Sequence, residues 1–157
     1  MEEDRLKKAL NAAYRCLARS PRSCIEVERR LREKNHPEPV IRQVIQRLKE
    51  YRYIDDQAFA RQWARDRIAR RRWGPSRLRI ELGRKGIAKE WIEETLRELF
   101  NEGDEETRAA ELVALRLKGR GLRDPRAYRR SFDYLLRRGY SADVVQTVLR
   151  RMKEGSE

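Results

Sequence analysis

Arginine side chains gather in two stretches of the sequence, and their density suits the binding of anionic groups. Between residues 61 and 85, ten residues are Arg or Lys and only Asp66 and Glu81 are acidic. A second basic stretch runs from Lys118 to Arg138. Arginine is permanently charged and presents a planar fork of N–H donors that matches the oxygen atoms of phosphates and carboxylates. These stretches therefore predict recognition of polyanions.

The distribution of charge along the chain supports this interpretation. The 39 Lys and Arg residues outnumber the 26 Asp and Glu residues, which gives a net charge of +13. Across residues 86–111 the sign inverts, with three basic and nine acidic residues. Blocks of one sign create a directional field, whereas mixed signs are typical of ordinary solvated helices. The candidate contact residues are the basic side chains of the two stretches: Arg61, Arg65, Arg67, Arg70, Arg71, Arg72, Arg77, Arg79, Arg84, Lys85, Arg120, Arg123, Arg126, Arg129, Arg130, Arg137 and Arg138.

No group of residues has the types and spacing of a catalytic site. His36 is the only histidine, and we expect a turn residue there because it stands beside Pro37 without a serine or cysteine partner. Gly119 and Gly121 lack the strand and the spacing of a phosphate-binding loop, which argues against an ATPase. We therefore expect no enzymatic activity.

Metal and cofactor sites are also not expected. Asp55 and Asp56 are better explained by helix capping, since carboxylates are favourable at the positive end of a helix. Cys16 and Cys24 lack the spacing of metal ligands, and we expect two buried, reduced thiols. No apolar run is long enough to span a membrane, and MEEDRLKKAL lacks the core of a secretory signal, so we expect a cytoplasmic protein.

The elements that position these residues are helices. Apolar residues recur at helical spacing throughout, and sustained alternation is absent, which predicts an all-α fold. The expected helices cover 4–19, 24–34, 39–50, 56–72, 75–85, 89–101, 105–118, 125–138 and 142–153. Ser23 with Glu26 fits a capping box, and Asp124 precedes Pro125 at a first-turn position. Asn35, Gly86 and Gly139 fit helix ends that need a left-handed residue.

These three helix ends also reveal a repeat. The pattern around Leu31 and Asn35 returns 51 residues later around Leu82 and Gly86, and again 53 residues later around Leu135 and Gly139. We predict three tandem three-helix repeats, at 1–54, 55–103 and 104–157. Small helical units bury little core alone, so neighbours should stack into an elongated molecule.

Three tryptophans could stack on nucleobases, but two of them have a simpler explanation. Trp63 and Trp91 lie on apolar helix faces and are expected in the core. Trp73 stands beside Gly74-Pro75, a predicted corner between two helices, and could serve either role.

Several of these residues together resemble the RecX family, bacterial regulators of the RecA recombinase. The resemblance rests on Tyr53-Ile54-Asp55-Asp56 followed by Phe59, and on Gly74-Pro75 with Leu82, Gly86 and Ile87. It extends to Arg22-Ser23 and Glu26 in the first repeat and to Gly139-Tyr140 in the third, and so covers essentially the whole chain.

The resemblance implies a curved molecule without enzymatic activity or cofactor. Such a protein binds RecA filaments on DNA and inhibits ATP hydrolysis and strand exchange. It implies RecA and its nucleoprotein filament as partners, with single- and double-stranded DNA bound more weakly. We expect a monomer that occupies the filament groove through the candidate arginines.

Two other functions share parts of this pattern. A general DNA- or RNA-binding module would bind naked nucleic acid as tightly as a filament and would lose affinity steeply with salt. A helical protein adaptor would be indifferent to salt and would need a neutral groove.

Overall fold

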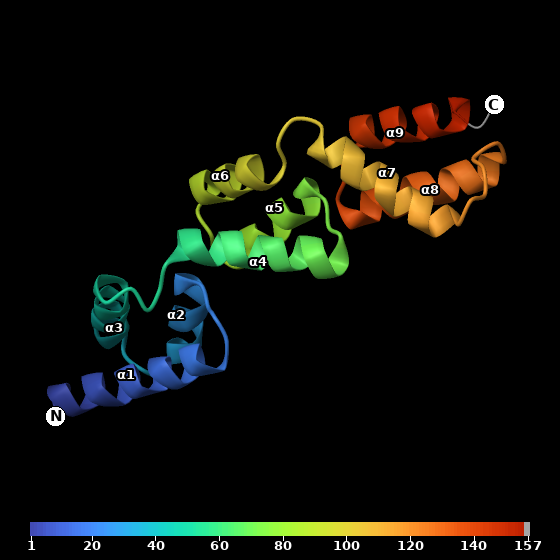
Figure 1. Ribbon diagram of the computed structural model, residues 1–157. Coiled ribbons are helices and arrows are strands. Elements are labelled where there is room, and N and C mark those ends of the chain that lie inside the picture. The colour runs from blue at the N-terminus through green and yellow to red at the C-terminus, as the bar shows by residue number, and fades with distance from the viewer. Residues whose placement is uncertain (156–157) are drawn as a thin grey trace. The chain divides into compact units, whose positions relative to one another are not determined.

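The computed structural model describes residues 1–155, and its ordered segments are α-helices joined by short turns (Figure 1). The first three helices are α1 (Glu2–Arg19), α2 (Cys24–Glu33) and α3 (Glu38–Glu50). The next three are α4 (Asp56–Arg71), α5 (Pro75–Arg84) and α6 (Lys89–Leu99). The last three are α7 (Asp104–Leu117), α8 (Pro125–Arg138) and α9 (Ala142–Glu154). The predicted all-α fold is confirmed, and every helix boundary lies within two residues of its expected position.

The chain divides into two compact units. The first unit comprises Met1–Gln62 and Leu82–Ile92, and the second comprises Trp63–Glu81 and the chain from Glu93 onward. Each of α4, α5 and α6 therefore contributes one end to each unit. The division into repeats at 1–54, 55–103 and 104–157 stays a prediction.

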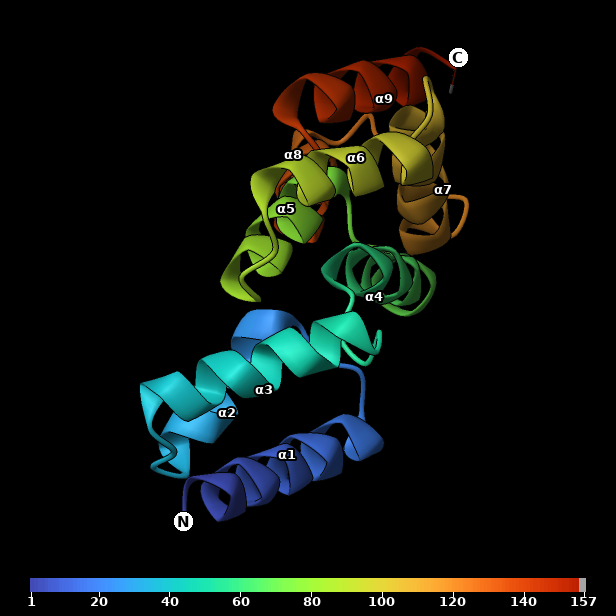
Figure 2. The ribbon, with the colours of Figure 1, turned by 90° about the vertical axis from the view of Figure 1, so that its left-hand side faces the viewer.

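The core of the first unit lies among α1, α2 and α3, which contact one another pairwise (Figure 2). Ala9, Val27, Leu31, Val44 and Leu48 are completely buried there. Each helix carries its apolar residues three or four positions apart, so one face of each is turned inward.

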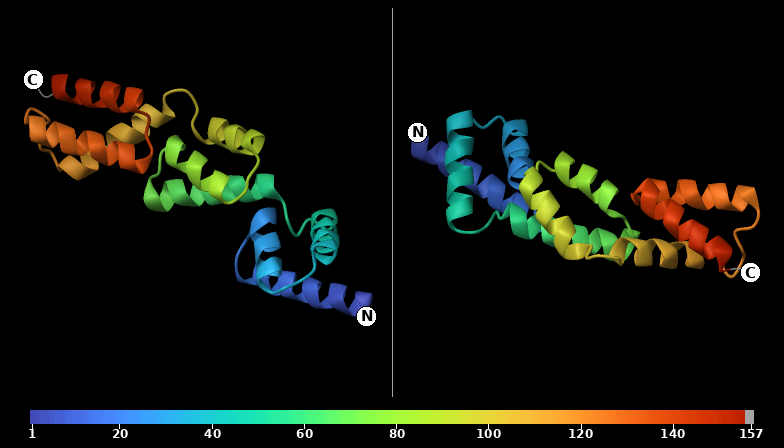
Figure 3. Two further views of the ribbon diagram at one scale, coloured as in Figure 1. Left: turned by 180° about the vertical axis from the view of Figure 1, so that it is seen from behind. Right: turned by 90° about the horizontal axis from the view of Figure 1, so that it is seen from above.

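The second unit has an equivalent core among α7, α8 and α9 (Figure 3). Val113, Leu135, Val145 and Leu149 are completely buried in it, and Leu122, from the turn before α8, is 1% exposed. As in the first unit, each of the three helices contacts the other two: α7 contacts α8 and α9 just as α1 contacts α2 and α3.

The predicted helix ends are confirmed in detail. Ser23 and Glu26 form a reciprocal capping box at the start of α2. The Asp124 side chain accepts a hydrogen bond from the Arg126 backbone N–H at 3.1 Å. Residues at three helix ends have left-handed backbones, with φ of 62° at Asn35, 77° at Gly86 and 96° at Gly139.

The Gly74-Pro75 corner docks on the carboxyl end of α8 within the second unit. The Gly74 N–H donates to the Arg138 carbonyl at 2.7 Å, and the Ser76 N–H donates to the Gly139 carbonyl at 2.9 Å. The backbones approach so closely that a Cβ built on Gly74 would lie 2.6 Å from the Gly139 carbonyl carbon. A Cβ on Gly139 would lie 2.3 Å from the Arg77 Cβ. Both glycines are thus required by contact between two helix ends.

An equivalent contact occurs in the first unit, between the start of α2 and the end of α5. The Ser23 hydroxyl donates to the Lys85 carbonyl at 2.6 Å. A Cβ on Gly86 would lie 2.4 Å from Ile25 Cγ1. The Cys24 N–H donates to Asp56 Oδ1 at 2.8 Å, so Asp56 caps α2 as well as standing in the first turn of α4. We refer to these two contacts as the helix-end junctions.

The two cysteines differ in their surroundings, and both are free thiols. Cys24 is buried beside the core as predicted, and burial raises the pKa of its thiol to about 11. The prediction of a buried Cys16 was wrong, because the face of α1 that carries it is only partly covered. Among the helices of residues 1–155, none is sufficiently long and apolar to cross a lipid bilayer.

We expect alanine substitutions at two glycines to change stability in opposite directions. Gly139→Ala should lower the free energy of unfolding by about 2 kcal/mol or more, because the new Cβ meets Arg77 and the backbone is left-handed. Gly83→Ala should raise it by about 1 kcal/mol, because Gly83 lies inside α5 with open space around its Cβ. Urea denaturation followed by circular dichroism measures both; equal effects would contradict the tight junction.

We also expect the two thiols to react at different rates with a thiol reagent at about pH 8. The thiolate is the reactive form, so Cys24 should stay protected and become reactive only toward pH 11, whereas the partly exposed Cys16 should react readily. Variants Cys16→Ala and Cys24→Ala each leave one thiol and assign the rates. Rapid modification of the folded Cys16→Ala variant at about pH 8 would refute this assignment.

Candidate polyanion-binding site

Several candidate arginines are held by aromatic rings in the second unit. The Arg77 guanidinium lies 4.1 Å from the centre of the Trp73 ring, and its Nη1 donates to the Arg137 carbonyl at 3.2 Å. Arg67 lies 4.9 Å from the Trp63 ring and 5.7 Å from the Trp73 ring. A guanidinium over an aromatic face is stabilised by the quadrupole of the ring, so these two side chains belong to the packing of the corner.

Other candidates are held by carboxylates or carbonyls. Arg79 binds both carboxylate oxygens of Glu93, at 2.7 and 3.3 Å, and this hydrogen bonding raises the pKa of Arg79. Arg70 Nε lies 2.8 Å from Asp66, and Arg138 donates to the Arg71 carbonyl at 2.6 Å. In the first unit Lys85 lies 3.5 Å from Glu26. The candidates that already interact with another residue of the chain are Arg61, Arg67, Arg70, Arg77, Arg79, Arg84, Lys85, Arg123 and Arg138.

A second group of candidates presents its guanidinium groups to solvent. Each of these side chains is exposed, belongs to the second unit, and has no ion pair or ring contact with any residue between 1 and 155. The group comprises Arg65, Arg71, Arg72, Arg120, Arg126, Arg129, Arg130 and Arg137. A partner can bind these groups without breaking an existing interaction. We call them the open arginines.

Two of the open arginines converge on one cavity. Arg120 and Arg130 line a hollow of about 490 Å³ between the end of α7 and the start of α8, together with Arg116 and Asp124. Arg116 was not among the predicted contact residues, and its guanidinium lies 4.2 Å from the Tyr134 ring. Its position just before the basic stretch that begins at Lys118 was the available signal.

The tryptophans correct one of the predictions. Trp91 is 39% exposed on α6, so the prediction of a core position was wrong: the apolar arc of α6 is wider than the face that packs. Trp63 is half-buried, and its ring centre lies 5.9 Å from that of Trp73. These two rings therefore pack against each other and against Arg67.

The residues that carry the family resemblance have structural positions. Ile54, Phe59, Leu82 and Ile87 are buried. Asp55 Oδ1 accepts a hydrogen bond from the Ala58 N–H at 3.0 Å and so caps α4. Gly74, Pro75 and Gly86 form the helix-end junctions described above.

Two tyrosines of these segments differ in exposure. Tyr53 is exposed, with its ring edge-on to Tyr14 at 5.1 Å. Tyr140 is buried, and its hydroxyl donates to the Arg72 carbonyl at 3.1 Å. Burial raises the pKa of the Tyr140 phenol to about 12, so it stays a neutral hydrogen-bond donor at any physiological pH.

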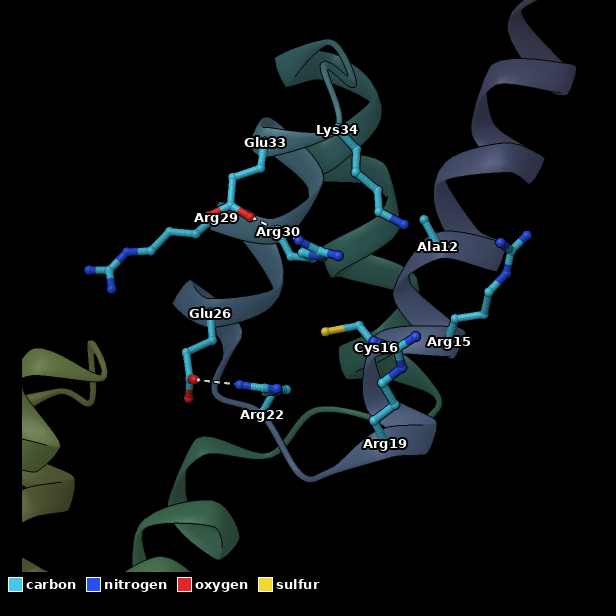
Figure 4. A pocket seen from close by; sticks show the side chains of 10 residues that line it. All are labelled: Ala12, Arg15, Cys16, Arg19, Arg22, Glu26, Arg29, Arg30, Glu33 and Lys34. Atoms are coloured by element: carbon cyan, nitrogen blue, oxygen red, sulfur yellow. Dashed lines mark hydrogen bonds and ion pairs between the residues drawn. The ribbon is translucent and has the colours of Figure 1, made fainter.

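A further basic cluster lies in the first unit between α1 and α2, two helices on which no contact residue was predicted. A groove of about 440 Å³ lies between α1 and α2 (Figure 4). It is lined by Ala12, Arg15, Cys16, Arg19, Arg22, Glu26, Arg29, Arg30, Glu33 and Lys34. This cluster is not evident in the sequence because glutamates are interspersed among the basic residues of α2. Helical spacing of Arg15 and Arg19, and of Arg30 and Lys34, was the available signal.

Models of known families match two parts of this chain. Residues 9–48 match the first three-helix domain of RecX, and residues 55–96 match its second three-helix domain. These matches agree with the first two predicted repeats.

Individual relatives extend the similarity over most of the chain. The regulatory protein RecX of Geobacillus thermodenitrificans is 36% identical over 148 residues, which cover 93% of this chain and 54% of that protein. The regulatory protein RecX of Mycobacterium sp. strain JLS is 34% identical over 153 residues, which cover 94% of this chain and 83% of that protein. The chain thus spans about half of the length of the first relative and most of the second.

Solved structures show the same arrangement of helices. A crystal structure of RecX from Lactobacillus salivarius superposes with a TM-score of 0.83 at 24% identity, covering 97% of this chain and 99% of that one. A second structure, of a regulatory protein RecX, gives a TM-score of 0.79 at 25% identity over 94% of this chain and 72% of that one. With the identity to the mycobacterial relative, these likenesses lead to one conclusion: the chain belongs to the RecX family of regulatory proteins.

Proposed function

We propose that this protein inhibits the RecA recombinase by binding the RecA filament on DNA through its open arginines. Occupancy of the filament groove then suppresses ATP hydrolysis and strand exchange. The observation that carries the proposal is the group of exposed guanidinium groups in the second unit that have no partner within residues 1–155. Membership of the RecX family supplies RecA as the partner.

The open arginines suit a surface that carries both carboxylates and phosphates, as a protein filament on DNA does. A guanidinium binds either anion through two parallel hydrogen bonds. Because the open arginines are already exposed and unpaired, binding costs only their partial desolvation and the loss of side-chain freedom. Arg79, by contrast, would have to leave Glu93.

Inhibition by occupancy requires no reacting groups on this protein. Among residues 1–155 no His, Cys, Asp and Glu side chains are grouped as metal ligands would be. A bound protein that bridges neighbouring filament subunits hinders the motions that accompany nucleotide turnover. The relatives carry the name of regulatory proteins, which accords with action on another enzyme.

We expect Arg126→Ala combined with Arg129→Ala and Arg130→Ala to weaken inhibition at least about tenfold. Arg129 and Arg130 lie three and four positions after Arg126 on α8, so each can serve the same surface of a partner as Arg126. An exposed ion pair contributes about 0.2–1 kcal/mol, so three together reach about the 1.4 kcal/mol that corresponds to a factor of ten. The measurement is RecA's DNA-dependent ATP hydrolysis at near-physiological salt as the protein is titrated in, with circular dichroism to confirm the fold.

The matched control is Arg97→Ala combined with Arg150→Ala and Lys153→Ala. These exposed cations belong to the same unit and remove the same charge, but lie outside the candidate group. Equal loss of inhibition in both triple variants would contradict a role for the open arginines. Inhibition by the unaltered protein only at concentrations that coat naked DNA would instead favour a general nucleic-acid-binding module.

A further inference from the structure

The groove between α1 and α2 carries more positive charge than its own acidic residues balance. Glu26 lies 3.3 Å from Arg22, and Glu33 lies 3.2 Å from Arg30, so each carboxylate already has an arginine partner. Arg29 donates to the Arg84 carbonyl. Three further cations line the same groove.

These three cations are Arg15, Arg19 and Lys34. None of them has an ion pair or a side-chain hydrogen bond with another residue between 1 and 155. All three side chains are exposed, so they reach the groove from its rim. Within residues 1–155, the groove therefore holds three cations without any side-chain partner, and Arg29 adds a fourth charge that no carboxylate balances.

The hollow itself results from small residues on α1. Ala12 and Cys16 stand four positions apart and form the α1 side of the groove (Figure 4). Arg19 continues the same face from α1, while Arg30 extends from α2 and Lys34 from the C-cap that follows it (Figure 4). Longer side chains at positions 12 and 16 would fill this space.

The spacing of the cations suits a linear chain of anionic groups. Arg15 and Arg19 are one helical turn apart on one wall, and Lys34, at the C-cap of α2, lies on the other. Side chains four residues apart on a helix are separated by about 6 Å at Cβ. A nucleic-acid strand repeats its phosphate with every nucleotide, so one strand offers a negative charge to each cation in turn.

We propose that this groove binds the phosphodiester backbone of single-stranded nucleic acid. Arg15, Arg19 and Lys34 contact successive phosphates, and the small side chains of Ala12 and Cys16 leave room for the strand. A volume of about 440 Å³ admits a segment of one strand. The site lies outside the open arginines and binds the strand without RecA.

The test is the affinity of the full chain for a fluorescently labelled oligothymidylate, measured by anisotropy without RecA. Arg15→Ala combined with Arg19→Ala and Lys34→Ala should weaken binding about tenfold at moderate salt. It should also lower the slope of log affinity against log salt by about 2, since each lost phosphate contact on a single strand contributes about 0.7. The matched control, Lys7→Ala with Arg42→Ala and Arg47→Ala, removes the same charge from exposed positions of the same unit and should lose less than about threefold.

A second variant tests the shape of the groove without changing its charge. Cys16→Phe places a large ring in the hollow and should weaken oligothymidylate binding at least about fivefold, provided that circular dichroism shows an intact helical fold. In the unaltered protein, bound oligothymidylate should also slow modification of the Cys16 thiol.

Three results would overturn the proposal. Equal losses in the groove triple and the control triple would mean that only the overall charge matters. Variant effects confined to a labelled oligoglutamate of equal length would assign the groove to an acidic protein segment. Protection of Cys16 by millimolar inorganic phosphate, with oligothymidylate binding unchanged in the groove variants, would assign it to a free anion. Because RecA is absent, each result is independent of the proposed inhibition.

Discussion

Close contact between helix ends is the constraint on which the rest of this structure depends. In the second unit the first N–H groups of the Gly74-Pro75 corner bind the last carbonyls of α8, and in the first unit the Ser23 hydroxyl binds the end of α5. Both ends carry a left-handed glycine, at Gly139 and Gly86, because a Cβ would collide with the incoming helix. Each contact also joins the positive end of one helix dipole to the negative end of another. The positions of the surrounding arginines follow from these contacts, since Arg77 and Arg138 are held across the α8 junction.

The sequence could predict features that depend on neighbouring residues. The cap at Ser23, the first turn at Pro125 and the left-handed residue at Gly139 follow from local stereochemistry, and all were confirmed. Features that depend on distant contacts could not be predicted. Asp56 caps a helix that begins 32 residues earlier, although it was expected to act only at its own helix, and Arg79 pairs with a glutamate 14 residues later, although it was a candidate contact residue.

The same limit applies to the candidate site. Most of the open arginines lie on α4 and α8, within the two basic stretches, but identical residue types there serve two purposes. Arg67 and Arg77 stack on tryptophans, whereas Arg65 and Arg130 face solvent, and only the folded chain distinguishes them. The groove of the first unit was missed because its cations come from two helices and do not form one basic stretch of sequence. Glu and Arg are interspersed along α2, so this helix looks neutral in sequence, but Arg15 and Arg19 of α1 and Lys34 at the end of α2 add cations that are unpaired within residues 1–155 to the same groove.

The helix-end junctions have a consequence for how such proteins diverge. The junction in the second unit is made largely by backbone N–H and carbonyl groups and by glycines, so few side-chain identities are required to keep it. Exposed positions a few residues away, such as Arg129 and Arg130, take no part in joining the helices. Substitutions can therefore change the exposed charged residues while the contact between the helix ends is kept. A fold joined in this way can follow changes in its partner over evolutionary time without first being rebuilt.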